Sequence, residues 1–256
     1  MLEDALAYPL RTDDRVATLI VGGALILASV FVLPAFVLQG YLLRVLRSAA
    51  TGERAAPSFT DWGELFVDGL KLVVVQAVYG VVIAVPVVAA VVALLVGGAT
   101  GSDAGIAAFG AVSLLLLLLA TLLSVAVAYV LPAAMTNFAL AGEVGAAFDA
   151  KALREAALSG RYLVGVLFGV VLAGVIGSVA SPFALILIGI PALFYGQVVA
   201  YYCFGRGVAE ATGVGTVAED PGPHGNTDAA EDPDASEDAD AAEDPDASDP
   251  TRTDTL

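Results

Sequence analysis

Hydrophobic side chains fill four long stretches of this chain that contain no Asp, Glu, Lys, Arg or His: 16–43, 72–102, 104–142 and 162–205. A bilayer core about 30 Å thick is crossed by about 20 apolar helical residues, so each stretch is long enough to span it. Hydrocarbon offers backbone N–H and C=O groups no partner, so such stretches are expected to be helical. The pattern predicts an all-α integral membrane protein that crosses the bilayer several times.

Turn residues divide the four stretches into about five transmembrane helices. The third stretch has no turn cluster in its middle and is expected to be one long helix bent near Pro132. The fourth is broken between Gly177 and Pro182 and is expected to form a helical hairpin. The predicted spans are 16–43, 72–98, 105–141, 162–180 and 184–205. A bundle of six spans is the alternative, if residues 2–15 are reassigned.

Two segments between the spans have the polarity pattern of interfacial helices. Along 58–71, acidic side chains recur on one face and aromatic and aliphatic side chains on the other. This amphipathic helix is expected to lie at the cytoplasmic interface with Trp62 as its anchor at the level of the headgroups. A second, weaker helix of this kind is expected over 147–160.

The net charge of −16 belongs to the C-terminal tail rather than to the apolar body. Residues 213–256 hold 14 acidic residues against Arg252 alone and contain no aromatic residue, which predicts disorder. The chain therefore divides into an N-terminal segment (1–15), a transmembrane helical domain (16–212) and a disordered acidic tail (213–256). Scarce lysine and an acidic surface suit a cytoplasm at very high salt.

The basic residues between the predicted spans set an orientation. With the N-terminus outside the cell, nine basic residues fall on the cytoplasmic side and only Arg11 and Arg15 lie outside. This imbalance follows the positive-inside rule and predicts a multi-pass protein of the cell (plasma) membrane with a cytoplasmic tail. Arg11 and Arg15 fit this arrangement least well, since both would have to be translocated.

The segment before the second span resembles a known family. Gly40-Tyr41, Gly52-Glu53, Pro57, Phe59, Asp61-Trp62, Leu65-Phe66 and Asp68-Gly69-Leu70-Lys71 are similar to domain of unknown function 4013, a family common in halophilic archaea. Tyr8-Pro9, Phe148-Asp149 and Phe204-Gly205-Arg206 fit the same pattern, so the resemblance covers about residues 3–210. It implies a multi-pass archaeal membrane protein and supplies no activity, substrate or catalytic residue.

Two sets of residues within the spans are candidates for a functional or packing role. The carboxamides are expected near the cytoplasmic ends of the helices, either as a polar cluster lining a vestibule or, as we favour, as links between helices; they are Gln39, Gln76, Asn137 and Gln197. A ladder of small residues at four-residue spacing predicts close helix packing, within the chain rather than between copies; it comprises Gly165, Gly169, Ala173, Gly177 and Ser181.

No pattern in the chain indicates catalysis. The spans hold no Asp, Glu, Lys, Arg or His that could activate a group for acid–base or nucleophilic chemistry, and no metal-ligand or phosphate-loop motif occurs. We therefore expect no enzyme activity, no cofactor and no nucleic-acid partner. A structural, scaffolding or accessory membrane protein fits best, with the lipid bilayer and a membrane-protein partner or second copy as its contacts. A passive pore or small-solute permease component is the alternative.

Overall fold

The computed structural model describes residues 2–12 and 14–214, and within these residues all regular structure is helical. The helices are α1 (Leu2–Ala7), η1 (Tyr8–Leu10), α2 (Arg15–Ala28), α3 (Val32–Ala50), α4 (Trp62–Ala99), α5 (Asp103–Ala141), η2 (Val144–Phe148), α6 (Ala150–Ala157), α7 (Gly160–Ala184) and α8 (Gly189–Thr212). The expectation of an all-α fold is confirmed for this part of the chain. The predicted disordered tail falls almost wholly on 215–256, outside the described residues.

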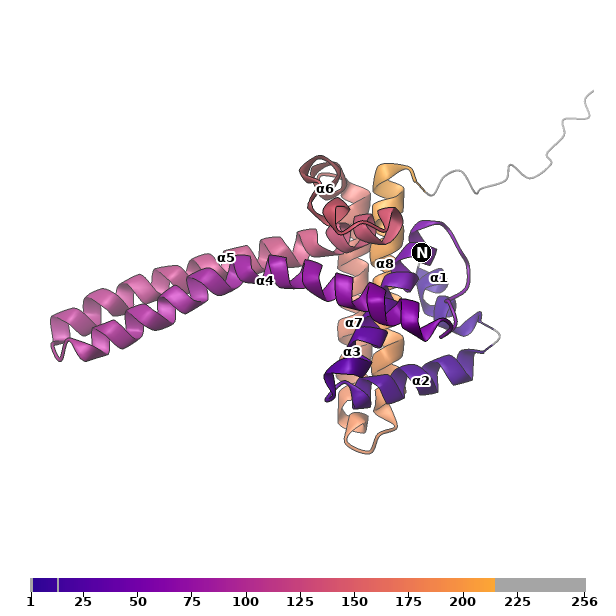
Figure 1. The fold of residues 1–256 in the computed structure, drawn as a ribbon, viewed down its shortest axis with the longest axis horizontal. Helices are drawn as coiled ribbons and strands as arrows, with labels where there is room; N and C mark the ends of the chain where they lie inside the picture. The colour runs from indigo at the N-terminus through magenta and orange to yellow at the C-terminus, as the bar shows by residue number, and fades with distance from the viewer. Residues whose placement is uncertain (1, 13, 215–256) are drawn as a thin grey trace, which may run out of the picture. The chain divides into compact units, whose positions relative to one another are not determined.

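Among the described residues, three helices are long and apolar enough to cross a membrane: α4, α5 and α7. The helices form two side-by-side pairs, α4 with α5 and α7 with α8 (Figure 1). Small residues line the seam between α4 and α5, where Ala90, Gly97 and Ala120 are buried. Large aliphatic side chains point outward from the same two helices; Leu95 and Leu114 are each 69% exposed.

The predicted span 16–43 differs from the structure, which divides it into α2 and α3. Pro34 lies in the first turn of α3, where its missing N–H costs no helical hydrogen bond. Just before it, the Ser29 hydroxyl donates to the Leu25 carbonyl and the Phe31 N–H to the Ala28 carbonyl, which ends α2. The stretch is apolar throughout, although the helix is interrupted between Ala28 and Val32.

Two further boundaries differ from those expected. The predicted interfacial helix 58–71 is not separate, because its residues from Trp62 onward form the first turns of α4. The turn predicted near Gly177 and Pro182 lies instead at residues 185–188, and Pro182 is inside α7. Ser178 and Ser181 donate to carbonyls one turn back, so both side chains are satisfied within the helix. At the new turn, Leu187 takes a left-handed conformation with φ 66°.

The remaining expectations concern α5 and the segment after it. The stretch 105–141 is one helix, α5, as expected, and Pro132 lies inside it. The predicted helix 147–160 is shorter in the structure, where η2 is followed by α6. Asp149 caps α6 by accepting hydrogen bonds from the backbone N–H groups of Lys151 (2.9 Å) and Ala152 (3.3 Å).

Candidate functional site

Helices α3 and α4 cross with their backbones in contact at two glycines. A Cβ added to Gly40 would lie 1.8 Å from the carbonyl oxygen of Leu65, and one added to Gly69 would lie 1.7 Å from that of Phe36. Neither position has room for any side chain. Both glycines belong to the block that carries the family resemblance, so that block encodes a helix crossing.

An aromatic cluster covers the side of this crossing that faces α8. The rings of Tyr41 and Phe59 stack with centroids 4.0 Å apart, and Phe194 of α8 lies 5.5 Å from Tyr41. The Tyr41 hydroxyl donates to the carbonyl of Pro57 at 3.1 Å. Trp62 lies at the edge of the cluster, 6.1 Å from Phe59, and is 49% exposed. Its exposure is compatible with the anchoring role expected for it.

Two arginines of α3 bind the ends of neighbouring helices. Arg44 donates to the Thr60 carbonyl at 3.1 Å and lies 3.5 Å from the carboxylate of Glu64 in the first turn of α4. Arg47 donates through Nε to the carbonyl of Ala139 at 2.6 Å. That carbonyl lies in the last turn of α5, where the helix dipole favours a positive charge. Sequence reasoning counted these arginines as loop charges and missed their role in joining helices.

Tyr162 of α7 reaches into the backbone of α5 beside Pro132. Its hydroxyl donates to the carbonyl of Tyr129 and accepts from the N–H of Ala133 at 3.2 Å. In a regular helix these two backbone groups would bond each other, and a side chain between them is a recognised cause of helix bending. Tyr162 is fully buried. No sequence pattern identified this contact, because its two partners lie on another helix, 29 and 33 positions away.

The four predicted carboxamides do not share one environment. Gln76 of α4 donates to Oε1 of Gln39 at 3.4 Å and lies 3.5 Å from the sulfur of Met135. Asn137 lines a different cavity, and the Gln197 side chain forms no hydrogen bond with the described residues. The structure thus brings Gln39 and Gln76 together as a link between α3 and α4.

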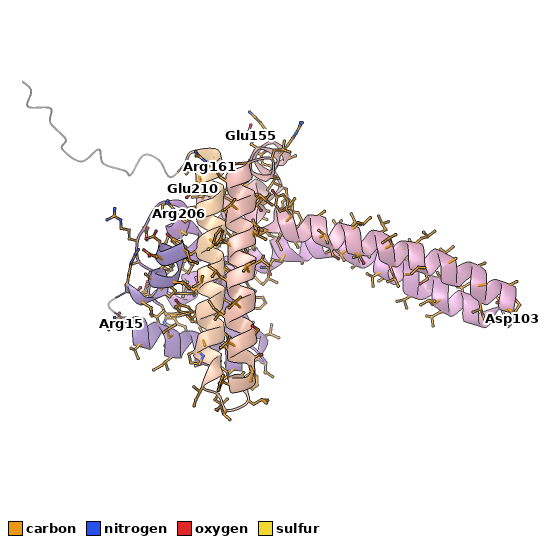
Figure 2. The ribbon with its side chains drawn as sticks, turned by 180° about the vertical axis from the view of Figure 1, so that it is seen from behind. Arg15, Asp103, Glu155, Arg161, Arg206 and Glu210 are labelled. Atoms are coloured by element: carbon orange, nitrogen blue, oxygen red, sulfur yellow. The ribbon has the colours of Figure 1, made fainter. Side chains whose placement is uncertain are left out.

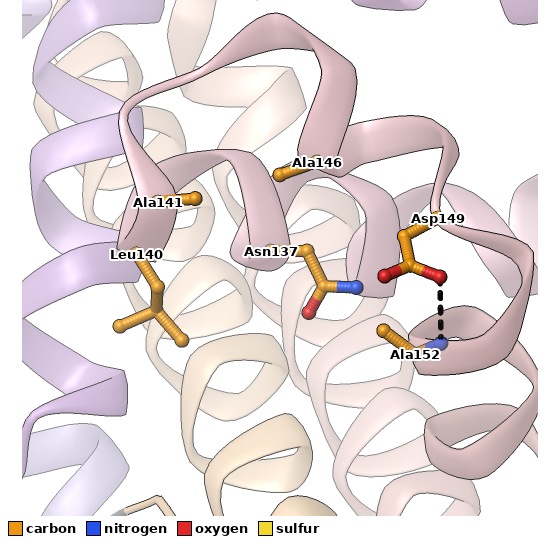
Figure 3. A pocket seen from close by; sticks show the side chains of 6 residues that line it. All are labelled: Asn137, Leu140, Ala141, Ala146, Asp149 and Ala152. Atoms are coloured by element: carbon orange, nitrogen blue, oxygen red, sulfur yellow. Dashed lines mark hydrogen bonds between the residues drawn. The ribbon is translucent and has the colours of Figure 1, made fainter.

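The cavity beside Asn137 has a volume of about 330 Å³ and lies between the end of α5 and the segment from η2 to α6 (Figure 3). Its lining consists of Asn137, Leu140, Ala141, Ala146, Asp149 and Ala152. Nδ2 of Asn137 is buried and has no hydrogen-bond partner among the described residues. In Figure 3 this nitrogen points toward Asp149. The Asp149 carboxylate accepts the hydrogen bond from Ala152, drawn dashed, that caps α6. The cavity therefore offers one amide donor opposite one carboxylate.

The predicted small-residue ladder on α7 makes close contacts along its first half. A Cβ on Gly165 would lie 2.7 Å from the Cα of Gly207, and one on Gly169 would lie 2.6 Å from the ring of Phe204. Ala173 is half-buried beside α8. A Cβ on Gly177 would meet no atom within 4 Å, and Ser181 is exposed. The ladder packs α7 on α8 over its first two positions.

The N-terminal segment is bonded to the connection between α3 and α4. The hydroxyl of Thr12 donates to the carbonyl of Ala56 at 2.7 Å, and the N–H of Ala56 donates to the carbonyl of Tyr8 at 3.3 Å. Tyr8 is fully buried with its ring 4.4 Å from that of Tyr202, and burial raises the pKa of its hydroxyl. A hydrogen bond from the Arg11 guanidinium lowers the pKa of the exposed Asp4 carboxyl. This segment is thus part of the packed body.

Comparison with known proteins gives one family. A model of the family described as "Protein of unknown function (DUF4013)" matches residues 24–188, more than half of the chain, and confirms the family resemblance noted from the sequence. Neither the curated proteins nor the solved structures contain a match.

Proposed function

The chain belongs to the DUF4013 family, whose function is unknown, and we therefore propose its role from its own geometry: an integral membrane protein that serves as a structural, scaffolding or accessory component of a membrane assembly. The observation that carries the proposal is the outward apolar surface of α4, α5 and α7, each of which is long and apolar enough to cross a membrane. Burying apolar surface is worth about 25 cal/mol per Å², so such a surface is costly in water. A contiguous apolar patch of this extent is typical of lipid or protein contact.

The polar side chains among the helices support a structural role over transport. Gln39 and Gln76 bond each other, and Arg47 and Tyr162 bind backbone groups of α5. A passive pore or permease component, the alternative function, would need its carboxamides to line one passage. No contact in the described residues supports such a passage, so we retain the structural role as the proposal. It includes no catalytic step, because the charge-free stretches supply no Asp, Glu, Lys, Arg or His that could serve as general acid or base or activate a nucleophile.

The finer parts of the proposal rest on the sequence. The excess of basic residues between the apolar stretches supports the cell membrane as location. The scarcity of lysine and the acidic residues of 213–256 support an archaeal host adapted to high salt. The exposed apolar helix faces support a membrane-protein partner or a second copy as the protein contact.

Membrane integration can be tested by two matched leucine substitutions. Leu115 of α5 is 67% exposed and Leu158, between α6 and α7, is 75% exposed. On insertion scales a lysine at the centre of a spanning helix costs about 2.5 to 3.5 kcal/mol. We expect Leu115→Lys to reduce strongly the carbonate-resistant fraction of the protein in membranes, while Leu158→Lys leaves it unchanged. Recovery of the wild type in the carbonate wash, or equal behaviour of both variants, would contradict the proposal.

The accessory role is tested by chemical cross-linking in intact membranes, followed by extraction in mild detergent. Mass spectrometry and light scattering of the extracted protein are expected to show a stoichiometric complex with another membrane protein or a second copy. A monomer without cross-links that increases solute flux when placed in liposomes would favour the pore instead.

A further inference from the structure

The two ends of the charge-free stretch 16–43 lie on the same side of the folded chain. Thr12, which precedes the stretch, donates to the carbonyl of Ala56, which follows it. Ala56 in turn donates to the carbonyl of Tyr8, so two hydrogen bonds hold the ends together. A segment that crosses a bilayer once has its ends on opposite faces, separated by a hydrocarbon core of about 30 Å. These contacts are incompatible with a single crossing by residues 16–43.

Neither helix of this stretch reaches across the bilayer from its charged end. The 14 residues of α2 measure about 21 Å at about 1.5 Å per residue. In α3, Arg44 follows Val32 by twelve positions, about 18 Å of helix. Both lengths fall short of the hydrocarbon thickness. The chain between Arg15 and Arg44 has the dimensions of an element that enters one side of the membrane and returns.

The connection between α2 and α3 is suited to hydrocarbon rather than to water. Val30 is 87% exposed and Phe31 is 73% exposed, and no charged residue is near them in sequence. Backbone groups in hydrocarbon must be satisfied by the protein. Here the N–H groups of Ser29 and Phe31 donate to carbonyls of α2, as does the Ser29 hydroxyl. The turn therefore combines an apolar exterior with internal hydrogen bonds.

The connection between α4 and α5 has the opposite character. It consists of Thr100, Gly101 and Ser102, and the Ser102 hydroxyl caps α5 by accepting from the N–H of Gly105. Asp103 is exposed there, at the end of the α4–α5 pair away from the other labelled charged residues (Figure 2). A polar, capped turn with a carboxylate is suited to water on the far side of a membrane.

We infer that residues 15–43 form a re-entrant element whose apolar turn inserts among the acyl chains of one leaflet, and that the N-terminal segment lies on the same membrane face as the α3–α4 connection. The inference rests on the proposed membrane location and changes the orientation expected from the sequence. Arg11 and Arg15 join Arg44 and Arg47 on one face. By the positive-inside rule this face is the cytoplasmic one, and the α4–α5 pair crosses from it to the Asp103 turn on the far side.

The test uses single cysteines in a Cys203→Ala background, since Cys203 is the only cysteine of the chain. The exposed positions replaced are Glu3, Glu53, Asp103 and Val30, each by cysteine. A membrane-impermeant maleimide is applied to sealed right-side-out and inside-out vesicles. Glu3→Cys and Glu53→Cys are expected to react only in inside-out vesicles, and Asp103→Cys only in right-side-out vesicles. Val30→Cys is expected to react in neither until detergent is added.

Each result decides between defined alternatives. Labelling of Glu3→Cys on the Asp103 face, or of Val30→Cys on either face of sealed vesicles, would overturn the inference while leaving membrane integration intact. Labelling of every position in both vesicle types, with the protein released by carbonate, would overturn membrane integration and the inference together. A membrane-permeant maleimide, which should label Val30→Cys in sealed vesicles, controls for its reactivity.

Discussion

At the scale of single residues, two glycines and one tyrosine decide how the helices meet. Gly40 and Gly69 allow the backbones of α3 and α4 to touch, and Tyr162 occupies the hydrogen-bonding gap beside Pro132. The sequence indicated small-residue packing on α7 but gave no reason to pair Gly40 with Gly69. A glycine's partner lies on another helix, so spacing along one helix cannot identify it.

Gly69→Ala is expected to destabilise the protein, because the added Cβ would overlap the Phe36 carbonyl and force α3 and α4 apart. Overpacking of this kind costs about 1 to 3 kcal/mol. Gly80→Ala, on the same helix, meets no atom within 4 Å and is expected to be neutral or slightly stabilising. Unfolding temperatures of both variants in detergent provide the measurement. Equal destabilisation by the two substitutions would show that the α3–α4 crossing is not as described.

Tyr162→Phe is expected to lower the free energy of unfolding by about 1 to 3 kcal/mol, because the buried carbonyl of Tyr129 and N–H of Ala133 lose their shared partner. Tyr201→Phe is the matched control, since the Tyr201 hydroxyl forms no hydrogen bond with the described residues. Denaturant titration in detergent compares the two. A Tyr162→Phe variant as stable as the control would mean that α5 closes its own hydrogen bonds at this point.

At the scale of elements, the prolines show how far a local pattern predicts helix boundaries. Pro34 marks the start of α3, whereas Pro86, Pro132 and Pro182 lie inside helices. A proline frees a carbonyl and removes a donor, and its effect depends on what else satisfies the backbone. Beside Pro132, the hydroxyl of Tyr162 binds the next carbonyl and N–H along the helix, those of Tyr129 and Ala133. The sequence predicted the long helix α5 correctly but placed the α7–α8 turn several residues too early.

The short helix α6 depends on its N-cap. Asp149→Ala removes both hydrogen bonds of the cap and is expected to cost about 1 kcal/mol, while Ser or Asn at this position should retain most of the stability. Hydrogen exchange of the α6 amides measures the change directly. Glu155→Ala, at an exposed position of the same helix, controls for the loss of a carboxylate. Unaltered exchange in Asp149→Ala would mean that packing alone holds α6.

At the scale of the whole molecule, membrane insertion and stability of the apolar part are expected not to depend on the acidic C-terminal segment. Residues 213–256 carry 14 acidic residues and no aromatic one, so this segment offers little apolar surface to pack on the helices. A chain ending at Val214 is expected to insert into membranes and unfold at the same temperature as the full chain. The comparison is made at low and high salt. A lower unfolding temperature for the shortened chain at both salt concentrations would assign the tail a stabilising role.

The sequence by itself determined that the chain is helical, which stretches are apolar and where the charge lies, because hydropathy and charge are properties of neighbouring residues. It did not determine which residues distant in sequence contact one another. Only the tertiary structure placed Thr12 against Ala56 and Gly40 against Gly69, and it thereby replaced a first crossing by two short helices. The reason is physical: a hydrogen bond between residues 44 positions apart, or a contact between two backbones, leaves no periodic signal in the chain.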